Sequence, residues 1–168
     1  MLEDGSVYEG TARGDFKETA CEIVFNTSMT GYVEILTDPS YAGQGVVMTY
    51  PMIGNYGISR EDFESERLQP SAFIVHELSS DPSNFRCTDT IENLLKEYNI
   101  PCISGVDTRA VVKKLRESGT MRGVLTSDIG DRERLMDVIK SFRQIDLVGS
   151  VTAKQTKVYG EENTGAEI

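Results

Sequence analysis

The sequence has few of the residues that bind metals or form disulfides. It contains one histidine, His76, and three cysteines, Cys21, Cys87 and Cys102, none of which forms a Cys-x-x-Cys pair. Zinc sites depend on clustered Cys and His ligands. An odd number of widely spaced cysteines is typical of buried or incidental thiols in a reducing compartment. The sequence therefore predicts neither a metal site nor a disulfide framework.

Long apolar runs and targeting signals are also missing. No apolar run approaches the roughly 20 residues that a membrane-spanning helix needs. Residues 1–4 lack the basic and apolar regions of a secretory signal. We therefore expect a cytoplasmic protein without a membrane partner.

Positive charge is scarce. The chain has 17 basic and 27 acidic residues, for a net charge of -10, and such a chain is repelled by nucleic acid unless a basic patch compensates. The basic residues are concentrated between Arg109 and Arg122, mostly on one predicted helix. The glycines match neither the P-loop nor the Gly-x-Gly-x-x-Gly pattern, so we expect no nucleic-acid partner and no ATP bound to this chain.

The composition is that of a globular domain. With 168 residues, of which 39% are hydrophobic and 26% charged, the chain is long enough for one well-packed domain. After Asp146 it becomes polar and shows no helical or strand period. We therefore predict a domain over residues 1–150 and a linker or truncated end over residues 151–168.

Short apolar segments bounded by turn residues predict the strands. Asp4-Gly5 has the composition of a hairpin turn, which predicts residues 6–10 as a returning strand. Residues 73–75 are apolar in succession, as in a strand buried on both faces. The full set of further strand predictions comprises residues 20–25, 45–50, 71–78, 101–106 and 121–126.

Three amphipathic helices are predicted in the second half of the chain. Apolar residues at 91, 94, 95 and 98 follow a helical period, and Asp89 with Glu92 resembles a capping box. Asp107 is the expected N-cap of a second helix, which ends at Gly119. Asp131 opens a third helix, which extends to Phe142. Arg109, in the first turn of the second helix, is expected to pair with a neighbour or a partner.

The order of these elements predicts an α/β fold. Strands come first, followed by helix, strand, helix, strand and helix, and strand–helix–strand crossovers require parallel pairing. We therefore expect a three-layer β/β/α domain with an antiparallel sheet, a mostly parallel sheet and a layer of helices.

Residues 25–57 carry the densest polar motifs. Hydroxyl and amide side chains, glycines and aromatics alternate here without a helical period, as in a loop that fixes a polar ligand. An alternative is that residues 37–40 and 54–57 only form turns and pack against the domain. The residues alone favour the turns and packing.

Several long strings in this region resemble the small chain of carbamoyl-phosphate synthetase. They read FNTSMTGY at 25–32, EILTDPSY at 34–41 and YPMIGNYG at 50–57. Three further strings are similar to the same family, namely SNFR at 83–86, ISGVDTR at 103–109 and LRESG at 115–119. The resemblance covers nearly the whole chain in order, and it implies the amino-terminal "swivelling" β/β/α domain of that family.

The resemblance also implies partners and a reaction. In this family a class I glutamine amidotransferase domain follows in the same chain, and its Cys–His–Glu triad hydrolyses L-glutamine. Ammonia then passes through a tunnel to a large subunit, which uses two ATP, Mg and bicarbonate to make carbamoyl phosphate for arginine and pyrimidine synthesis. The expected assembly is a heterodimer, with no cofactor on the present chain.

The resemblance assigns roles to three residues. Ser40 is similar to the serine that contributes to the glutamine pocket. Asp38 and Met29 are candidates for the ammonia route or for an interface.

A catalytic residue is not expected on this chain. None of the three cysteines lies in a Gly-x-Cys-x-Gly elbow, and His76 within an apolar strand is poorly placed as a base. The paired carboxylates of residues 61–66 favour an exposed acidic loop or a solvated helix face over an acid–base pair. We therefore expect this polypeptide alone to be inactive. The alternatives are a stand-alone binding or scaffold module and, less favoured, a hydrolase that uses Cys102 or Ser40.

Overall fold

A six-stranded mixed sheet forms the centre of the domain. The computed structural model describes residues 1–14, 16–143, 147–153 and 155–156. The strand order is β1-β7-β5-β3-β2-β8, with parallel pairing between β7, β5, β3 and β2 and antiparallel pairing of β1 and β8 at the two edges. These strands are β1 (Thr11–Arg13), β2 (Thr19–Asn26), β3 (Gln44–Met48), β5 (Ala72–Ile74), β7 (Cys102–Ser104) and β8 (Met121–Leu125).

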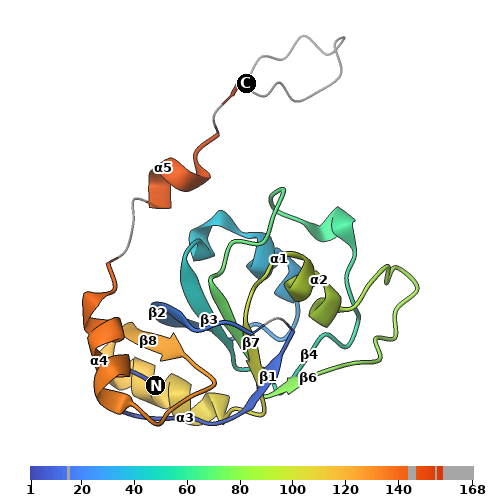
Figure 1. The fold of residues 1–168 in the computed structure, drawn as a ribbon. Helices are drawn as coiled ribbons and strands as arrows, with labels where there is room; N and C mark the ends of the chain where they lie inside the picture. The colour runs from blue at the N-terminus through green and yellow to red at the C-terminus, as the bar shows by residue number, and fades with distance from the viewer. Residues whose placement is uncertain (15, 144–146, 154, 157–168) are drawn as a thin grey trace.

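A small second sheet and five helices complete the described fold (Figure 1). The small sheet pairs β4 (Met52–Ile53) with β6 (Glu77–Leu78) in parallel. The helices are α1 (Tyr32–Thr37), α2 (Ile91–Glu97), α3 (Thr108–Ser118), α4 (Arg132–Ser141) and α5 (Leu147–Val151), with 3-10 turns η1 (Pro39–Tyr41) and η2 (Arg60–Asp62). None of the described helices is long and apolar enough to cross a membrane.

Alternation along the strands divides the core between the two faces of the large sheet. In β3, Val46 packs with α1 and α2, whereas Val47 packs with α3, because successive side chains point to opposite faces. Both are completely buried. Helix α4 packs over Val124 of β8, at the edge of the sheet.

The predicted α/β class, with two sheets and helices, is confirmed, but the antiparallel pairing is placed differently. The antiparallel pairs lie at the two edges of the large sheet, and the small sheet is parallel. The prediction of an N-terminal hairpin was wrong. The turn does form, with the Gly5 N–H donating to the Leu2 carbonyl at 2.9 Å, but residues 6–10 form no strand. Instead Glu3 N–H donates to the Arg122 carbonyl at 2.9 Å, because the edge strand β8 offers unpaired backbone groups.

The residues at which α3 and α4 begin, and at which α3 ends, were predicted correctly. Asp107 and Asp131 cap α3 and α4 by accepting from the backbone N–H groups of Ala110 and Arg134, and Gly119 ends α3 with a φ of 83°. The cap of α2 is Thr90 rather than Asp89. Helices α1 and α5 were not predicted. The proposed linker over residues 151–168 lies mostly outside the described residues.

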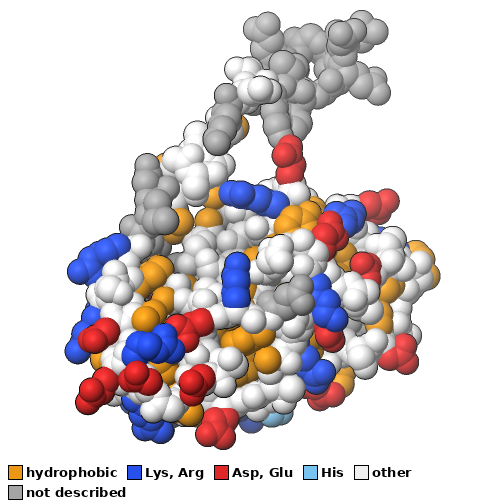
Figure 2. Space-filling view, viewed as in Figure 1, with side chains coloured by type: hydrophobic (Ala, Val, Ile, Leu, Met, Phe, Trp, Pro, Cys, Tyr) orange, Lys and Arg blue, Asp and Glu red, His pale blue; other side chains and the backbone are white. Residues whose placement is uncertain are grey.

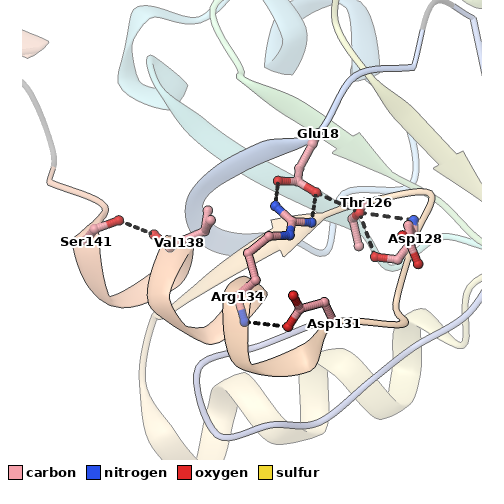
Figure 3. Close-up of polar contacts among 7 residues, drawn as sticks. All are labelled: Glu18, Thr126, Asp128, Asp131, Arg134, Val138 and Ser141. Carbon is pink, nitrogen blue, oxygen red and sulfur yellow. Dashed lines mark hydrogen bonds and ion pairs between the residues drawn. The ribbon is translucent and has the colours of Figure 1, made fainter.

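A bidentate ion pair joins Arg134 of α4 to Glu18, the residue before β2 (Figure 3). The two terminal nitrogens of Arg134 donate to the two carboxylate oxygens of Glu18 at 2.7 and 2.8 Å. The Thr126 hydroxyl donates to the same carboxylate at 2.9 Å. These bonds, Arg134 first, lower the pKa of Glu18 to about 2. Figure 2 shows basic and acidic side chains interspersed over the lower part of the face, where α4 lies.

Candidate functional site

Two stacked tyrosines organise the segment from residue 25 to residue 57. The rings of Tyr32 and Tyr56 lie 4.2 Å apart at 20°. The Tyr56 hydroxyl accepts from the backbone N–H groups of Gly31 at 2.7 Å and Tyr32 at 3.2 Å. The Tyr32 hydroxyl donates to the Gly57 carbonyl at 2.8 Å. Burial raises the pKa of both phenols. This network holds the start of α1 against the turn at residues 54–57.

Ser40 lies on a short, capped 3-10 turn. The Asp38 carboxylate accepts from the Ser40 N–H at 2.8 Å, and Pro39 supplies the first residue of the turn. The neighbouring Tyr41 hydroxyl accepts from the Asn26 amide at 2.9 Å. Ser40 is exposed, and no described residue hydrogen-bonds to its hydroxyl. The turn therefore presents a free hydroxyl on a braced backbone.

Met29 and Asp38 lie at opposite ends of α1. Met29 is in the loop before the helix and is 69% exposed, whereas Asp38 is the C-cap residue. A helix of six residues is about 9 Å long, so Met29 lies apart from Asp38 and Ser40, which are neighbours on the same turn. Neither of the two hollows described below is lined by any of the three.

The segment between α1 and α2 is fixed by hydrogen bonds and ion pairs, and its acidic residues are not arranged as a catalytic pair. The buried Thr37 hydroxyl accepts from the Glu64 N–H at 2.9 Å. Arg86 donates to Glu61 at 3.1 Å and to Asp62 at 2.7 Å. Glu61 and Asp62 thus pair with a cation and are not arranged as an acid–base pair.

The thiols are not arranged for catalysis. Cys21 and Cys102 are completely buried, and desolvation raises the pKa of each thiol to about 12. Cys87 is half-buried and donates to the Asp89 carbonyl at 3.3 Å. His76 is exposed, with Nδ1 lying 3.0 Å from the Val106 carbonyl oxygen. Among the described residues no histidine is hydrogen-bonded to a thiol, and no cluster of His, Cys, Asp and Glu could hold a metal ion.

Two hollows were not predicted. An apolar cavity of about 440 Å³ lies between the sheet and the N-terminal segment that contains Tyr8 and Phe16. A polar groove of about 760 Å³ lies between α3 and the residues that follow β2 and β3. The basic wall of the groove had a signal in the sequence, the spacing of Arg109, Lys113 and Arg116. The opposite wall had none.

The fold and the site together define a three-layer α/β domain with exposed polar loops and no activated nucleophile among its described residues. Comparison with known proteins identifies its family. Residues 1–125 match the family model of the carbamoyl-phosphate synthase small chain, CPSase domain, and the chain belongs to that family.

Individual relatives agree with this assignment. The chain is 54% identical to the carbamoyl phosphate synthase small chain of Fusobacterium nucleatum, over 92% of this chain and 43% of the relative. It is 50% identical to that of Archaeoglobus fulgidus, over 93% and 44%, and 43% identical to that of Listeria monocytogenes, over 100% and 46%. The chain thus spans less than half the length of these relatives.

Proposed function

We propose that this chain acts in glutamine-dependent carbamoyl-phosphate synthesis as the amino-terminal domain of the small subunit, without a catalytic residue of its own. It docks on the large subunit and forms one wall of the glutamine site, beside the amidotransferase domain of the parent chain. ATP, Mg and bicarbonate are used by the large subunit, in the cytoplasm, and the product serves arginine and pyrimidine synthesis. The observation that carries this proposal is the family match over residues 1–125.

The buried thiols support the absence of catalysis on this chain. A nucleophilic cysteine requires an accessible thiolate and a base, whereas Cys21 and Cys102 are buried with raised pKa values. We expect the purified 168-residue chain to release no ammonia from glutamine in a coupled assay. Steady, enzyme-dependent ammonia release would refute this part of the proposal.

Ser40 is the proposed contact to glutamine. Its exposed hydroxyl is free of described partners, and the Asp38 cap fixes the backbone that carries it. In the complete two-subunit enzyme, Ser40→Ala is expected to raise the KM for glutamine about 3- to 10-fold, the equivalent of one hydrogen bond. Ammonia-dependent synthesis should be unchanged.

A matched control is available in Ser28, an exposed serine of the loop before α1. Ser28→Ala should leave the KM for glutamine within about twofold of the wild-type value. If Ser40→Ala impaired the glutamine and ammonia reactions equally, Ser40 would have a structural role only.

Met29 and Asp38 are proposed to line the ammonia route or an interface beside it. An apolar side chain that is 69% exposed, as Met29 is, is suited to burial against another protein surface. In the complete enzyme Met29→Asp is expected to lower the carbamoyl phosphate formed per glutamine hydrolysed. An unchanged ratio would exclude Met29 from both roles.

A further inference from the structure

Three cations on α3 have no anionic partner among the described residues. Arg109, Lys113 and Arg116 are exposed and lie at spacings of four and three, so they share one face of the helix over about 10 Å. None of the three makes an ion pair with a described residue. Six other cations do, and they are Arg60, Arg86, Lys96, Lys114, Arg122 and Arg134. Other described cations also lack an ion pair, but these three lie together on one face of one helix.

The three cations form one wall of the groove of about 760 Å³. Hydroxyl groups form the opposite wall. Thr27 follows β2, and Thr49 and Tyr50 follow β3. No described residue hydrogen-bonds to these three hydroxyls. The groove thus places unpaired cations opposite unpaired hydroxyl donors, which is the chemistry that binds oxyanions.

The residues around the groove keep it basic. The Arg116 guanidinium lies 5.7 Å from the centre of the Phe25 ring, which holds this side chain over the sheet through a cation–π contact. Glu117 is the one acidic residue among those that line the groove. Three cations against one carboxylate leave a positive surface on a chain whose net charge is -10.

The dimensions of the groove favour a polypeptide over a small ion. The three cations are spread over about 10 Å of helix, so a peptide with several Asp or Glu residues can offer each of them its own carboxylate, whereas a single phosphate or carboxylate must share its oxygens among them. Nucleic acid would also present anions along its length, but the negative charge of the rest of the molecule repels it.

The groove also lies away from the C-terminal end of the described chain. Leu147, the first residue of α5, packs over Gly43 at the start of β3, whereas Thr49 follows the end of the same strand. Six residues of extended chain separate the two positions by about 20 Å. Figure 1 shows α5 above the sheet and α3 below it. The segment after α5 therefore begins on the side opposite to the groove.

From these observations we infer that the groove docks an acidic segment of the large synthase subunit. Carboxylates of that segment pair with Arg109, Lys113 and Arg116, and the hydroxyls of Thr27 and Thr49 donate to the remaining oxygens. This inference rests on the proposed function, because that function supplies the large subunit as the partner.

The first test measures binding between the complete small subunit and the large subunit. The triple variant Arg109→Glu, Lys113→Glu and Arg116→Glu is expected to bind at least about 100-fold more weakly than wild type, because each attraction becomes a repulsion. Raising the salt concentration should weaken the wild-type complex more steeply than the residual variant complex. Thermal unfolding of each protein verifies that it is folded.

The matched control reverses three exposed cations outside the groove, Lys17, Arg132 and Lys140. The change in net charge is the same in both triple variants. The control should bind the large subunit within about threefold of wild type, since its charges are not placed at the interface. Equal losses in the two variants would show a general effect of charge and would overturn the inference.

The second test identifies the contact directly. Carbodiimide joins an amine to a carboxylate without a spacer, so in the complex it should link Lys113 to an Asp or Glu of the large subunit. Lys113→Arg should keep binding within about threefold and lose this link. A link from Lys113 only to carboxylates of the small subunit would contradict docking at the groove.

The outcomes separate this inference from the proposed function. If wild type forms the complex and the groove variant binds equally well, the docking site is wrong and the proposed function stands. If wild type neither binds the large subunit nor supports glutamine-dependent synthesis, the proposed function fails and the inference with it. If inorganic phosphate binds the groove below about 1 mM while the groove variant still forms the complex, the groove is a small-anion site instead.

Discussion

The hydrogen-bond network around α1 and the groove beside α3 use polar side chains in opposite ways. In the first, Tyr32, Tyr56 and Asp38 each hydrogen-bond to the backbone of the same segment. In the groove, Arg109 and Lys113 have no described partner. Polar groups that are hydrogen-bonded within the chain hold a loop in place, whereas unpaired ones remain available to a ligand. The side chains of the network therefore stabilise the fold, whereas those of the groove are available to bind a partner.

Removing the buried tyrosine should have the largest effect on stability. Tyr32 is 1% exposed and stacks on Tyr56, so Tyr32→Ala is expected to lower the free energy of unfolding by about 3–5 kcal/mol. Tyr32→Phe keeps the ring but leaves the Gly57 carbonyl without its donor, at a cost of about 1–3 kcal/mol. Chemical denaturation measures both. A loss below about 1 kcal/mol for Tyr32→Ala would show that the network does not support the segment.

Gly57→Ala tests how closely the segment is packed. Gly57 has a φ of 69°, and an added Cβ would overlap the Cys87 sulfur. We expect a loss of about 2 kcal/mol or more, from backbone strain and steric overlap together. Gly119→Ala is the control, since Gly119 has a φ of 83° and open space around it, and it should show the strain alone. Cys87→Ala should partly restore Gly57→Ala but not Gly119→Ala.

The buried thiols predict a loss of stability at high pH. In the folded chain the pKa of Cys21 and of Cys102 is raised from 9.0 to about 12, so their contribution is complete below pH 9 and is lost as the pH rises toward 12. The expected loss near pH 10.5 is on the order of 1–2 kcal/mol per thiol. Denaturation between pH 7 and pH 11 measures it. The variant Cys21→Ala with Cys102→Ala should be less sensitive to alkaline pH than wild type.

Replacing groove cations should have the smallest effect on stability. Arg109→Ala with Lys113→Ala is expected to change the free energy of unfolding by no more than about 0.5 kcal/mol, because neither side chain has a described partner to lose. Thermal and chemical denaturation measure this change. A loss above about 1.5 kcal/mol would mean that these cations stabilise the domain, and the contrast between the two regions would fail.

Much of the fold could be predicted because its signals are local. Asp107 and Gly119 were identified as the limits of α3, since capping depends on neighbouring backbone groups. Helix α1 was missed because it has six residues and depends on the stacking of Tyr32 against a residue 24 positions away. Strand β1 was missed because its three exposed residues carry no apolar alternation and are held by pairing with β7.

The candidate site was predicted only in part. Ser40 was assigned by resemblance, and the structure shows an exposed hydroxyl on a capped turn, while its contact with glutamine stays a prediction. Asp38 is hydrogen-bonded to the backbone of Ser40, whereas Met29 lies at the other end of α1. The groove was not predicted because Thr27, Thr49 and the cations of α3 come from distant parts of the sequence.

The sequence by itself determined the buried strands, the caps of α3 and α4, the inert character of two thiols and the family of the chain. These follow from local periodicity, short-range hydrogen bonding and shared strings of residues. Only the tertiary structure decided which cations are neutralised. Arg134 meets Glu18, 116 positions away, whereas Arg109, Lys113 and Arg116 meet no described carboxylate. Charge pairing depends on distance in space, and that distance is set when the sheet forms and the helices pack on it.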